Sequence, residues 1–316
     1  MSGKHDNHTP RAADAAGIAA AVEILQAGGL VALPTETVYG LAARADEADA
    51  VAAIYRAKGR PDFNPLIVHV GALAQAQRLA QFDDRARALA KAFWPGALTL
   101  VLPLREDARI APAVTAGLAT IALRCPVHPV MRAVLEASGL ALAAPSANRS
   151  GAVSPTRAAH VVASLGDAVP LVLDGGACAA GIESTIVALR ANGGWQVLRP
   201  GPISEAQIAA VLGGAGDVVA SGGIEAPGQL ASHYAPGKPV RLNANAAEPD
   251  EFLIGFGALG GNVSLSASGD LAEAAARLYD CLHQAAAAPQ PRIAVAPVPE
   301  GGIGAAINDR LRRAAA

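Results

Sequence analysis

Short apolar runs of strand length alternate with longer amphipathic stretches over the first two thirds of the chain. The runs at 30–33, 66–70 and 98–104 are rich in Leu and Val, whereas 11–26 and 46–58 place apolar residues at helical spacing. Gly and Pro residues separate most of these segments, as expected where the chain turns between elements. The pattern predicts an α/β fold in which helices pack on a mixed, twisted sheet.

The pattern changes near residue 205, where a last helix of this sheet domain is expected. Residues 213–238 are rich in Gly, Ser, Pro and Ala, which is typical of a linker. Beyond it, a strand, a helix, a second strand and a second helix follow one another. We therefore expect a larger domain at 12–205, a helix end and linker at 206–238, and a small C-terminal α/β domain at 239–316.

Composition narrows the class of protein. Of 316 residues, 52% are hydrophobic and 16% charged, so the chain has too much apolar surface to remain disordered. No run of about 18 residues is free of charges or turn formers, and a membrane span is not expected. The first residues lack the apolar core of a signal peptide and the three cysteines lie far apart, which favours a cytoplasmic protein without disulfides. The net charge of −2 gives no long-range attraction to nucleic acid.

Two segments near the N-terminus carry candidate chemistry. The segment P-T-E-T-V-Y-G-L at 34–41 follows a predicted strand, where α/β folds place ligands, although it would also suit a polar turn. Lys58 and Arg60 could grip a polyphosphate together. Lys58 alone is interpreted more simply as a cation that stabilises the C-terminal end of a helix.

Further candidates lie in two loops and three strands. The segment 145–156 is rich in hydroxyls and enters a helix, so its amides could hold an anion or form an ordinary N-cap. The glycine-rich segment 174–187 lacks the G-K-[ST] of a Walker motif. Arg124 and Arg199 each end a strand, and His69 lies within an apolar strand, where a core histidine is the commoner case. The G-x-G-x-x-G match at 255–260 is interpreted as a turn, because no helix opens at its third glycine.

Taken together, these segments resemble the threonylcarbamoyl-AMP synthase family, whose catalytic unit is the YrdC-like domain. The segments P-T-E-T-V-Y-G-L, K-G-R-P-D-F-N-P-L-I-V-H, P-S-A-N-R-S-G, S-P-T and G-I-E-S-T-I-V occur in family order across roughly 15–201, with a strand ending in Arg124 among them. The segments 233–236 and 300–314 resemble the linker and accessory domain of the long, two-domain members. The resemblance implies a YrdC-like mixed sheet and a small Rossmann-like C-terminal domain.

The resemblance also implies an activity. Members of this family make L-threonylcarbamoyladenylate and pyrophosphate from L-threonine, bicarbonate and ATP, with Mg²⁺ expected on the triphosphate rather than on protein side chains. A separate tRNA threonylcarbamoyl-transfer complex then passes the threonylcarbamoyl group to an adenosine next to the anticodon. Stable nucleic-acid binding by this chain and membrane association are therefore not expected.

Individual residues receive roles from the same resemblance. Lys58 and Arg60 would be catalytic. The residues expected to bind L-threonine are Thr37, His69, Arg124, Ala144 and Ser184. Those expected to bind ATP are Arg60, Asn64, Thr120, Ser146, Ser154, Arg199 and Tyr234. Because Tyr234 and His233 form an aromatic pair in the linker, we expect the linker to cover the nucleotide rather than only join two domains.

Two other classes of function compete with this one. An RNA-binding module would need clustered Lys and Arg with stacking aromatics, but aromatics are 3% of the chain and its basic residues are spread out. A carbamoyl-transfer enzyme built on the same domain type would carry acyl-phosphatase and zinc-finger modules. Neither the length nor the cysteines of this chain allow them.

Overall fold

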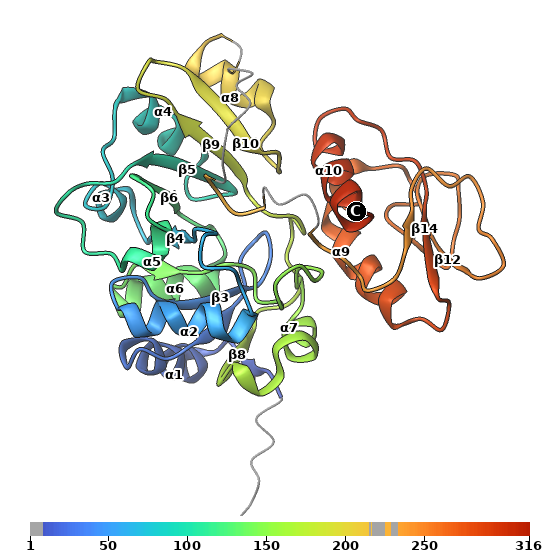
Figure 1. Cartoon of the computed structure of the whole chain (residues 1–316), viewed down its shortest axis with the longest axis horizontal. Coiled ribbons are helices and arrows are strands. Elements are labelled where there is room, and N and C mark those ends of the chain that lie inside the picture. Colours follow the sequence, from blue (N-terminus) through green and yellow to red (C-terminus); the bar gives the residue numbers. More distant parts are fainter. Residues whose placement is uncertain (1–8, 215, 217–224, 229–232) are drawn as a thin grey trace, which may run out of the picture.

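The computed structural model describes residues 9–214, 216, 225–228 and 233–316, and these form two α/β units that lie side by side (Figure 1). The predicted α/β class with a mixed sheet is therefore confirmed. The expected domain boundaries at 12–205, 206–238 and 239–316 stay predictions, because much of the segment between the two units lies outside the described residues.

The larger unit is built on a sheet with the strand order β1-β8-β2-β3-β7-β4-β6-β5-β9-β10. Parallel pairs such as β4 with β6 adjoin antiparallel pairs such as β5 with β6. The strands are β1 (Arg11–Ala12), β2 (Val31–Leu33), β3 (Gly40–Arg44), β4 (Ile67–His69), β5 (Leu98–Pro103), β6 (Thr120–Arg124), β7 (Leu142–Ala143), β8 (Leu171–Asp174), β9 (Thr185–Leu189) and β10 (Trp195–Arg199). Most strand residues are buried, as the continuous apolar runs in the sequence require.

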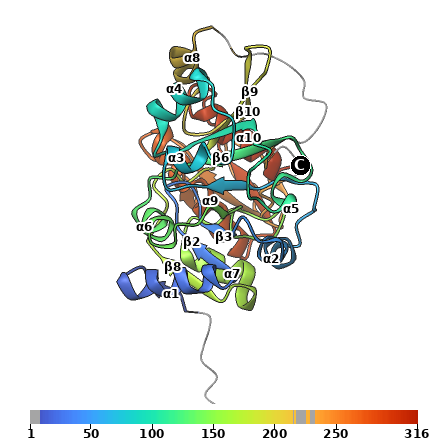
Figure 2. The same ribbon diagram turned by 90° about the vertical axis from the view of Figure 1, so that its left-hand side faces the viewer.

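Helices cover this sheet on both faces (Figures 1 and 2). They are α1 (Ala15–Gln26), α2 (Ala48–Lys58), α3 (Leu73–Ala76), α4 (Asp84–Phe93), α5 (Pro112–Thr115), α6 (Pro129–Ser138), α7 (Ala158–Leu165) and α8 (Glu205–Leu212), with a 3₁₀ turn at Gly166–Ala168. The helix expected at 11–26 begins only at Ala15, because the Asp14 side chain accepts a hydrogen bond from the Gly17 amide and caps it. Residues 11 and 12 instead pair with β8.

The C-terminal unit has a smaller, parallel sheet with the order β11-β14-β12-β13. Its strands are β11 (Val240–Arg241), β12 (Glu251–Gly255), β13 (Val263–Ser264) and β14 (Arg292–Val295), and its helices are α9 (Leu271–Ala287) and α10 (Gly304–Ala314). The sequence pattern missed β11 and β13, which have two residues each and leave no periodicity to detect. The G-x-G-x-x-G segment is a turn, as expected, in which the Phe256 amide donates to the Leu259 carbonyl.

Strand register brings chemically useful residues to one place in the larger sheet. His69 of β4 lies opposite Arg124 of β6, and Arg124 lies opposite Thr99 of β5. On the other side of β5, Leu98 pairs with Thr185, so that Ser184 arrives at the same edge. Four segments of the chain, in β4, β5, β6 and at the start of β9, thus place a histidine, an arginine and two hydroxyls close together.

The two units pack through an apolar cluster that crosses between them. Val38, Val153 and Ile182 of the larger unit share this cluster with buried residues of α9 and α10. In Figure 1 these two helices face the larger unit, and β12 and β14 lie on the outer side. Among the described residues, no helix is long and apolar enough to cross a membrane.

Gly181 allows this close packing and gives a test of it. Its φ is +67°, and a Cβ built on it would lie 2.4 Å from the Cα of Ala276 in α9. Gly193 has a φ of +92° and open space around it, so it supplies a matched control. We expect Gly193→Ala to lower the unfolding free energy by about 1 kcal/mol through backbone strain, and Gly181→Ala to cost about 1–3 kcal/mol more through overpacking. Urea denaturation measures both losses, and equal losses would contradict the packing argument.

Candidate active site

A cavity opens where β4 and β6 end and β9 begins. Most of the residues predicted to bind substrates line it, namely Thr37, Arg60, His69, Arg124, Ala144, Ser146, Ser184, Arg199 and Tyr234. Further lining residues, among them Thr35, Gly40 and Glu183, were not predicted as site residues from the sequence. One cavity therefore collects segments that are spread from residue 35 to residue 234 of the chain.

Arg124 is held in a fixed orientation within this cavity. Its Nη1 donates to Thr37 Oγ1 at 2.8 Å, and its Nη2 donates to Glu36 Oε1 at 2.6 Å. Burial acts to raise the pKa of Glu36, but the Arg124 guanidinium outweighs it and holds that pKa below its ordinary value. Glu36 is thus a partner that the sequence analysis missed, although it lies inside the P-T-E-T segment. A carboxylate ligand of Arg124 would share the guanidinium with Glu36.

His69 is a neutral, buried imidazole on the wall of the cavity. Burial, together with the nearby charge of Arg124, lowers its pKa to about 3. Its Nδ1 has no hydrogen-bond partner among the described residues. A buried polar atom without a partner is costly, so this nitrogen is suited to bond a ligand. His69 therefore differs from the satisfied core histidine that was the simpler interpretation of its strand.

Three basic side chains, Lys58, Arg60 and Arg199, lie near one another, and Arg60 and Arg199 line the cavity. Lys58 Nζ donates to the Ser146 carbonyl at 2.6 Å and to the Asn148 carbonyl. Arg60 donates to the carbonyls of Asn64 and Pro65 at 3.1 and 2.8 Å. Burial is the main cause that lowers the pKa of Lys58 well below its ordinary value and that of Arg60 to about 10.

Arg199, the third of these basic side chains, also donates to backbone carbonyls. It donates to the Ser184 carbonyl at 3.1 Å from Nε and 3.0 Å from Nη2, and to the Pro227 carbonyl at 3.3 Å. Among the described residues, none of these three cations has a carboxylate within ion-pair distance. Positive charge is therefore concentrated here without being neutralised by direct ion pairs, an arrangement that favours anionic ligands.

Four of the predicted residues do not line the cavity. Lys58 and Asn64 are buried, and the Asn64 Oδ1 has no partner among the described residues. Ser154 is also buried, and its hydroxyl donates to Glu183. Thr120 lies at the opposite end of β6 from Arg124, about 13 Å away by strand geometry. The nucleotide-binding roles of Asn64, Ser154 and Thr120 stay predictions.

Glu183 is a buried carboxylate in the cavity wall. It accepts hydrogen bonds from Ser154 Oγ at 2.7 Å, Tyr279 Oη at 2.8 Å and Arg310 Nε at 3.1 Å. Burial alone would raise its pKa, but the charges of Arg310 and Arg199 and these hydrogen bonds lower it to about 2. The signal in the sequence was a lone charge within the otherwise apolar and small G-I-E-S-T-I-V segment.

The described parts of the linker reach the cavity. Pro227, Gly228, His233 and Tyr234 line it, and Tyr234 is 1% exposed. A Cβ on Gly228 would lie 2.9 Å from the Arg199 Cδ, and the φ of Gly228 is +84°, so this position requires glycine. The expectation that the whole linker covers the nucleotide concerns residues 217–224 and 229–232 as well, which lie outside the described residues.

The fold and the cavity together define an α/β protein of two units with a binding site suited to small anionic molecules. Residues 23–201 match the family described as "Telomere recombination" (Sua5_yciO_yrdC). Residues 203–316 match "Threonylcarbamoyl-AMP synthase, C-terminal domain". The chain belongs to the threonylcarbamoyl-AMP synthase family.

Known relatives are similar over almost the whole chain. The chain is 40% identical to the threonylcarbamoyl-AMP synthase of Bacillus subtilis, over 94% of this chain and 92% of the relative. It is 37% identical to that of Pyrococcus abyssi, over 93% of this chain and 92% of the relative. Its fold matches the crystal structure of P. abyssi Sua5 complexed with L-threonine, with a TM-score of 0.86, 34% identity and 94% of each chain covered.

The charge state of His69 can be measured directly. We expect its ring to remain neutral from pH 8 down to pH 5, because burial and the Arg124 charge lower its pKa to about 3. The unfolded chain would take up this proton near pH 6.5, so His69 lowers the stability of the fold as the pH falls below that value. The ring signal of His69 is identified by nuclear magnetic resonance as the one that disappears in His69→Gln. Its pH titration gives the pKa, and a midpoint above 6 would contradict the assignment.

Proposed function

We propose that this chain synthesises L-threonylcarbamoyladenylate from L-threonine, bicarbonate and ATP, with release of pyrophosphate. The observation that carries the proposal is that one cavity brings Thr37, His69, Arg124 and Ser184 together with the cations Arg60 and Arg199. The relatives named threonylcarbamoyl-AMP synthase and the L-threonine complex of P. abyssi Sua5 support it. In this proposal the protein acts in the cytoplasm, and a separate transfer complex passes the threonylcarbamoyl group to a tRNA adenosine next to the anticodon.

The proposed reaction has two steps. The threonine amine attacks the carbon of bicarbonate, which gives a carbamate and water. A carbamate oxygen then attacks the α-phosphorus of ATP, so that one oxygen–phosphorus bond forms and the bond to pyrophosphate breaks. The site must orient two anionic reactants and screen their repulsion, and in this proposal Arg124, Arg60 and Arg199 do so.

This chemistry needs no covalent protein nucleophile, and the cysteines are consistent with that. Cys125, Cys178 and Cys281 are all buried. Burial raises the pKa of Cys178 to about 12 and that of Cys281 to about 11. A thiol with such a pKa is protonated at neutral pH and is a poor nucleophile.

Mg²⁺ is part of the proposal as the partner of the triphosphate, where it neutralises phosphate charge. Among the described residues, no group of three His, Cys, Asp or Glu side chains is placed to hold a metal ion. The carboxylate on the cavity wall, Glu183, already accepts three hydrogen bonds. The ion would therefore be held by phosphate oxygens and water, and the residues present fit that arrangement.

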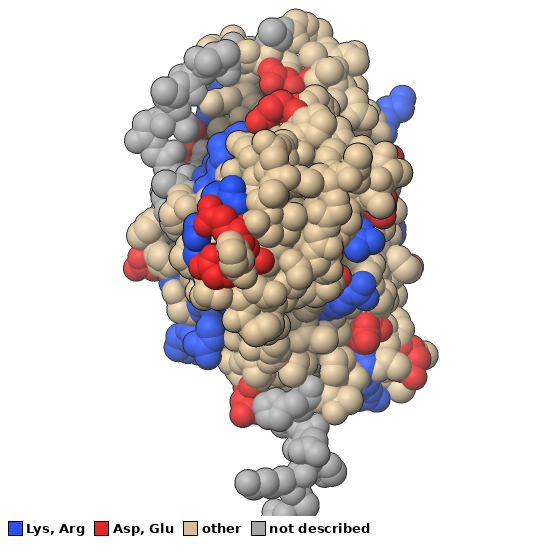
Figure 3. All heavy atoms as spheres, turned by 90° about the vertical axis from the view of Figure 1, so that its right-hand side faces the viewer, with Lys and Arg blue, Asp and Glu red and all other residues tan. Residues whose placement is uncertain are grey.

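In this proposal the chain acts on small molecules and does not bind nucleic acid stably. Figure 3 shows the outer face of the C-terminal unit, where acidic and basic side chains are mixed in small groups on a largely uncharged surface. The net charge of the chain is −2. This face does not offer the continuous basic surface that binding to phosphate backbones requires.

Pyrophosphate release tests the proposal. We expect release only when ATP, L-threonine and bicarbonate are present together, measured by a coupled pyrophosphatase assay. Serine lacks one methyl group, which discriminates by only about 1–3 kcal/mol, so slower release with serine is expected. Comparable release with leucine, or without any amino acid, would overturn the proposed function.

Arg60 provides a second test, with Arg56 as its matched control on the same helix end. We expect Arg60→Ala to lose about 2–4 kcal/mol of transition-state stabilisation, because a charge-assisted phosphate contact is removed. Arg56 is exposed, and Arg56→Ala should leave turnover unchanged. Arg60 also holds the Asn64 and Pro65 carbonyls, so thermal unfolding is measured in parallel. A folded Arg60→Ala protein with near-normal turnover would refute the assigned role.

A further inference from the structure

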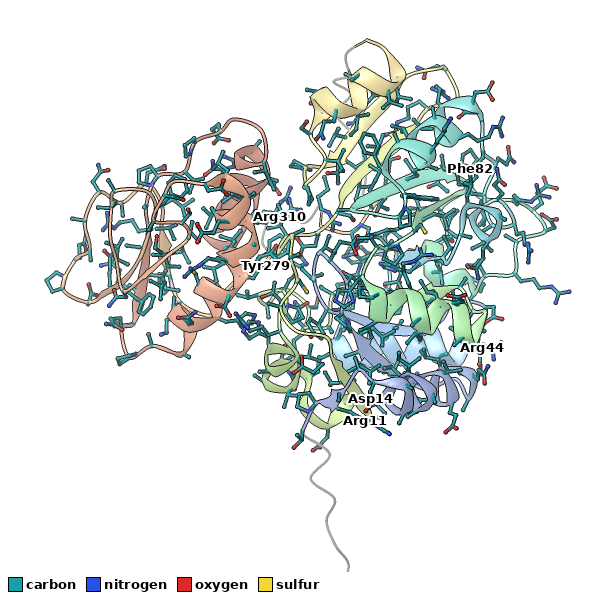
Figure 4. The ribbon with its side chains drawn as sticks, turned by 180° about the vertical axis from the view of Figure 1, so that it is seen from behind. Arg11, Asp14, Arg44, Phe82, Tyr279 and Arg310 are labelled. Atoms are coloured by element: carbon teal, nitrogen blue, oxygen red, sulfur yellow. The ribbon has the colours of Figure 1, made fainter. Side chains whose placement is uncertain are left out.

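The C-terminal unit reaches the cavity wall through two buried side chains. Tyr279 of α9 donates its hydroxyl to Glu183 Oε2 at 2.8 Å, and Arg310 of α10 donates its Nε to the same oxygen at 3.1 Å. Both side chains are fully buried. In Figure 4 both are labelled where α9 and α10 face the larger unit. Glu183, which lines the cavity, is therefore anchored from the other domain.

Glu183 is joined directly to a residue predicted to bind threonine. The next residue, Ser184, is fixed by Arg199, which donates to its carbonyl, and by a 2.8 Å hydrogen bond between the hydroxyls of Ser184 and Thr99. One carboxylate oxygen of Glu183 also accepts the Ser154 hydroxyl. Glu183 is thus linked to both serines, to Ser154 through a hydrogen bond and to Ser184 through the peptide chain.

Arg310 also contacts the linker aromatic. Its guanidinium carbon lies 5.7 Å from the centre of the Tyr234 ring, and the rings of Tyr234 and Tyr279 are 5.4 Å apart. Tyr234 lines the cavity, whereas Arg310 and Tyr279 do not. The two C-terminal side chains therefore support two separate parts of the cavity wall without facing the cavity themselves.

A contribution to the stability of the fold does not by itself explain why a charged pair is buried here. A buried ion pair such as Glu183–Arg310 is often replaceable by apolar residues without loss of stability, because both charges must be desolvated. An apolar cluster already joins the two units around it. A role in the geometry of the cavity gives the charged pair a function that an apolar contact could not supply.

We propose that Arg310 and Tyr279 are positioning residues for adenylate formation, which hold Glu183 and through it set the positions of Ser184 and Ser154. The inference rests on the proposed function for the reaction concerned. It assigns the C-terminal unit a defined part in that reaction, since the cavity wall takes its working shape only when α9 and α10 are docked.

The adjacent residue Asp280 supplies a matched control. It also lies on α9 and also bonds across the two units, with Arg157 Nε at 2.9 Å, but at the surface and away from Glu183. If docking of the two units were all that mattered, Asp280→Asn and Tyr279→Phe would have similar effects. If the position of Glu183 matters, Tyr279→Phe should impair the reaction, whereas Asp280→Asn should not.

Kinetics of the full-length chain separate these cases. We expect Tyr279→Phe to lower kcat for pyrophosphate release by about 10-fold or more, the loss typical of one hydrogen bond to a charged group, with Asp280→Asn within twofold of the unmodified chain. Loss of this donor raises the pKa of Glu183, so the acid side of the pH–rate profile should move toward neutral pH only in Tyr279→Phe. Arg310→Lys keeps the charge and should recover part of the rate lost in Arg310→Met. A Tyr279→Phe protein with unchanged kcat and pH profile would overturn the inference.

A second readout does not depend on activity. Hydrogen exchange of the backbone amides from 182 to 185 should be faster in Tyr279→Phe than in Asp280→Asn, because the loop has lost its anchor. Equal exchange in the two variants would overturn the positioning role. An unmodified chain that releases no pyrophosphate would refute the proposed function, whereas the exchange result would still decide whether Tyr279 fixes this loop.

Discussion

The carboxylate of Glu183 is the point at which the two units and the cavity wall meet. A buried carboxylate stays ionised only while donors and positive charge surround it, because burial alone raises its pKa. Here Ser154, Tyr279 and Arg310 supply the hydrogen bonds, and the pKa falls to about 2. The loop that leads into β9, and with it Ser184, therefore depends on contacts from both units.

The cations around the cavity fall into two groups with different partners. Arg124 and Arg310 are in ion pairs with carboxylates, which fixes their orientation. Arg60 and Arg199 instead donate to backbone carbonyls, which orient them but leave their charge available. Burying a charge without a counter-ion is costly, so the fold maintains this second group at the expense of stability. Such preoriented charge is what stabilises phosphate groups during a displacement.

The sequence predicted the α/β class and half of the residues that line the cavity, because strand patterns and short motifs are local features. The features that it did not predict depend on contacts between residues far apart in the chain. Glu36 and Glu183 were missed because their meaning comes from partners 88 and 127 residues away, Arg124 and Arg310. Two-residue strands such as β11 were missed because they exist only through pairing with neighbours. No pattern in the sequence marks His69 as neutral, since its pKa follows from burial in the assembled sheet.

The backbone conformation of Tyr234 connects the linker to the two side chains that bind Glu183. Its φ is +65°, in the left-handed region that costs a residue with a side chain about 1 kcal/mol or more. This conformation persists because the ring is fully enclosed, with Tyr279 at 5.4 Å and the Arg310 guanidinium at 5.7 Å. The pair of side chains that holds Glu183 thus also offsets the strain of the linker. Since Tyr234 lines the cavity, docking of the C-terminal unit shapes the cavity from two directions at once.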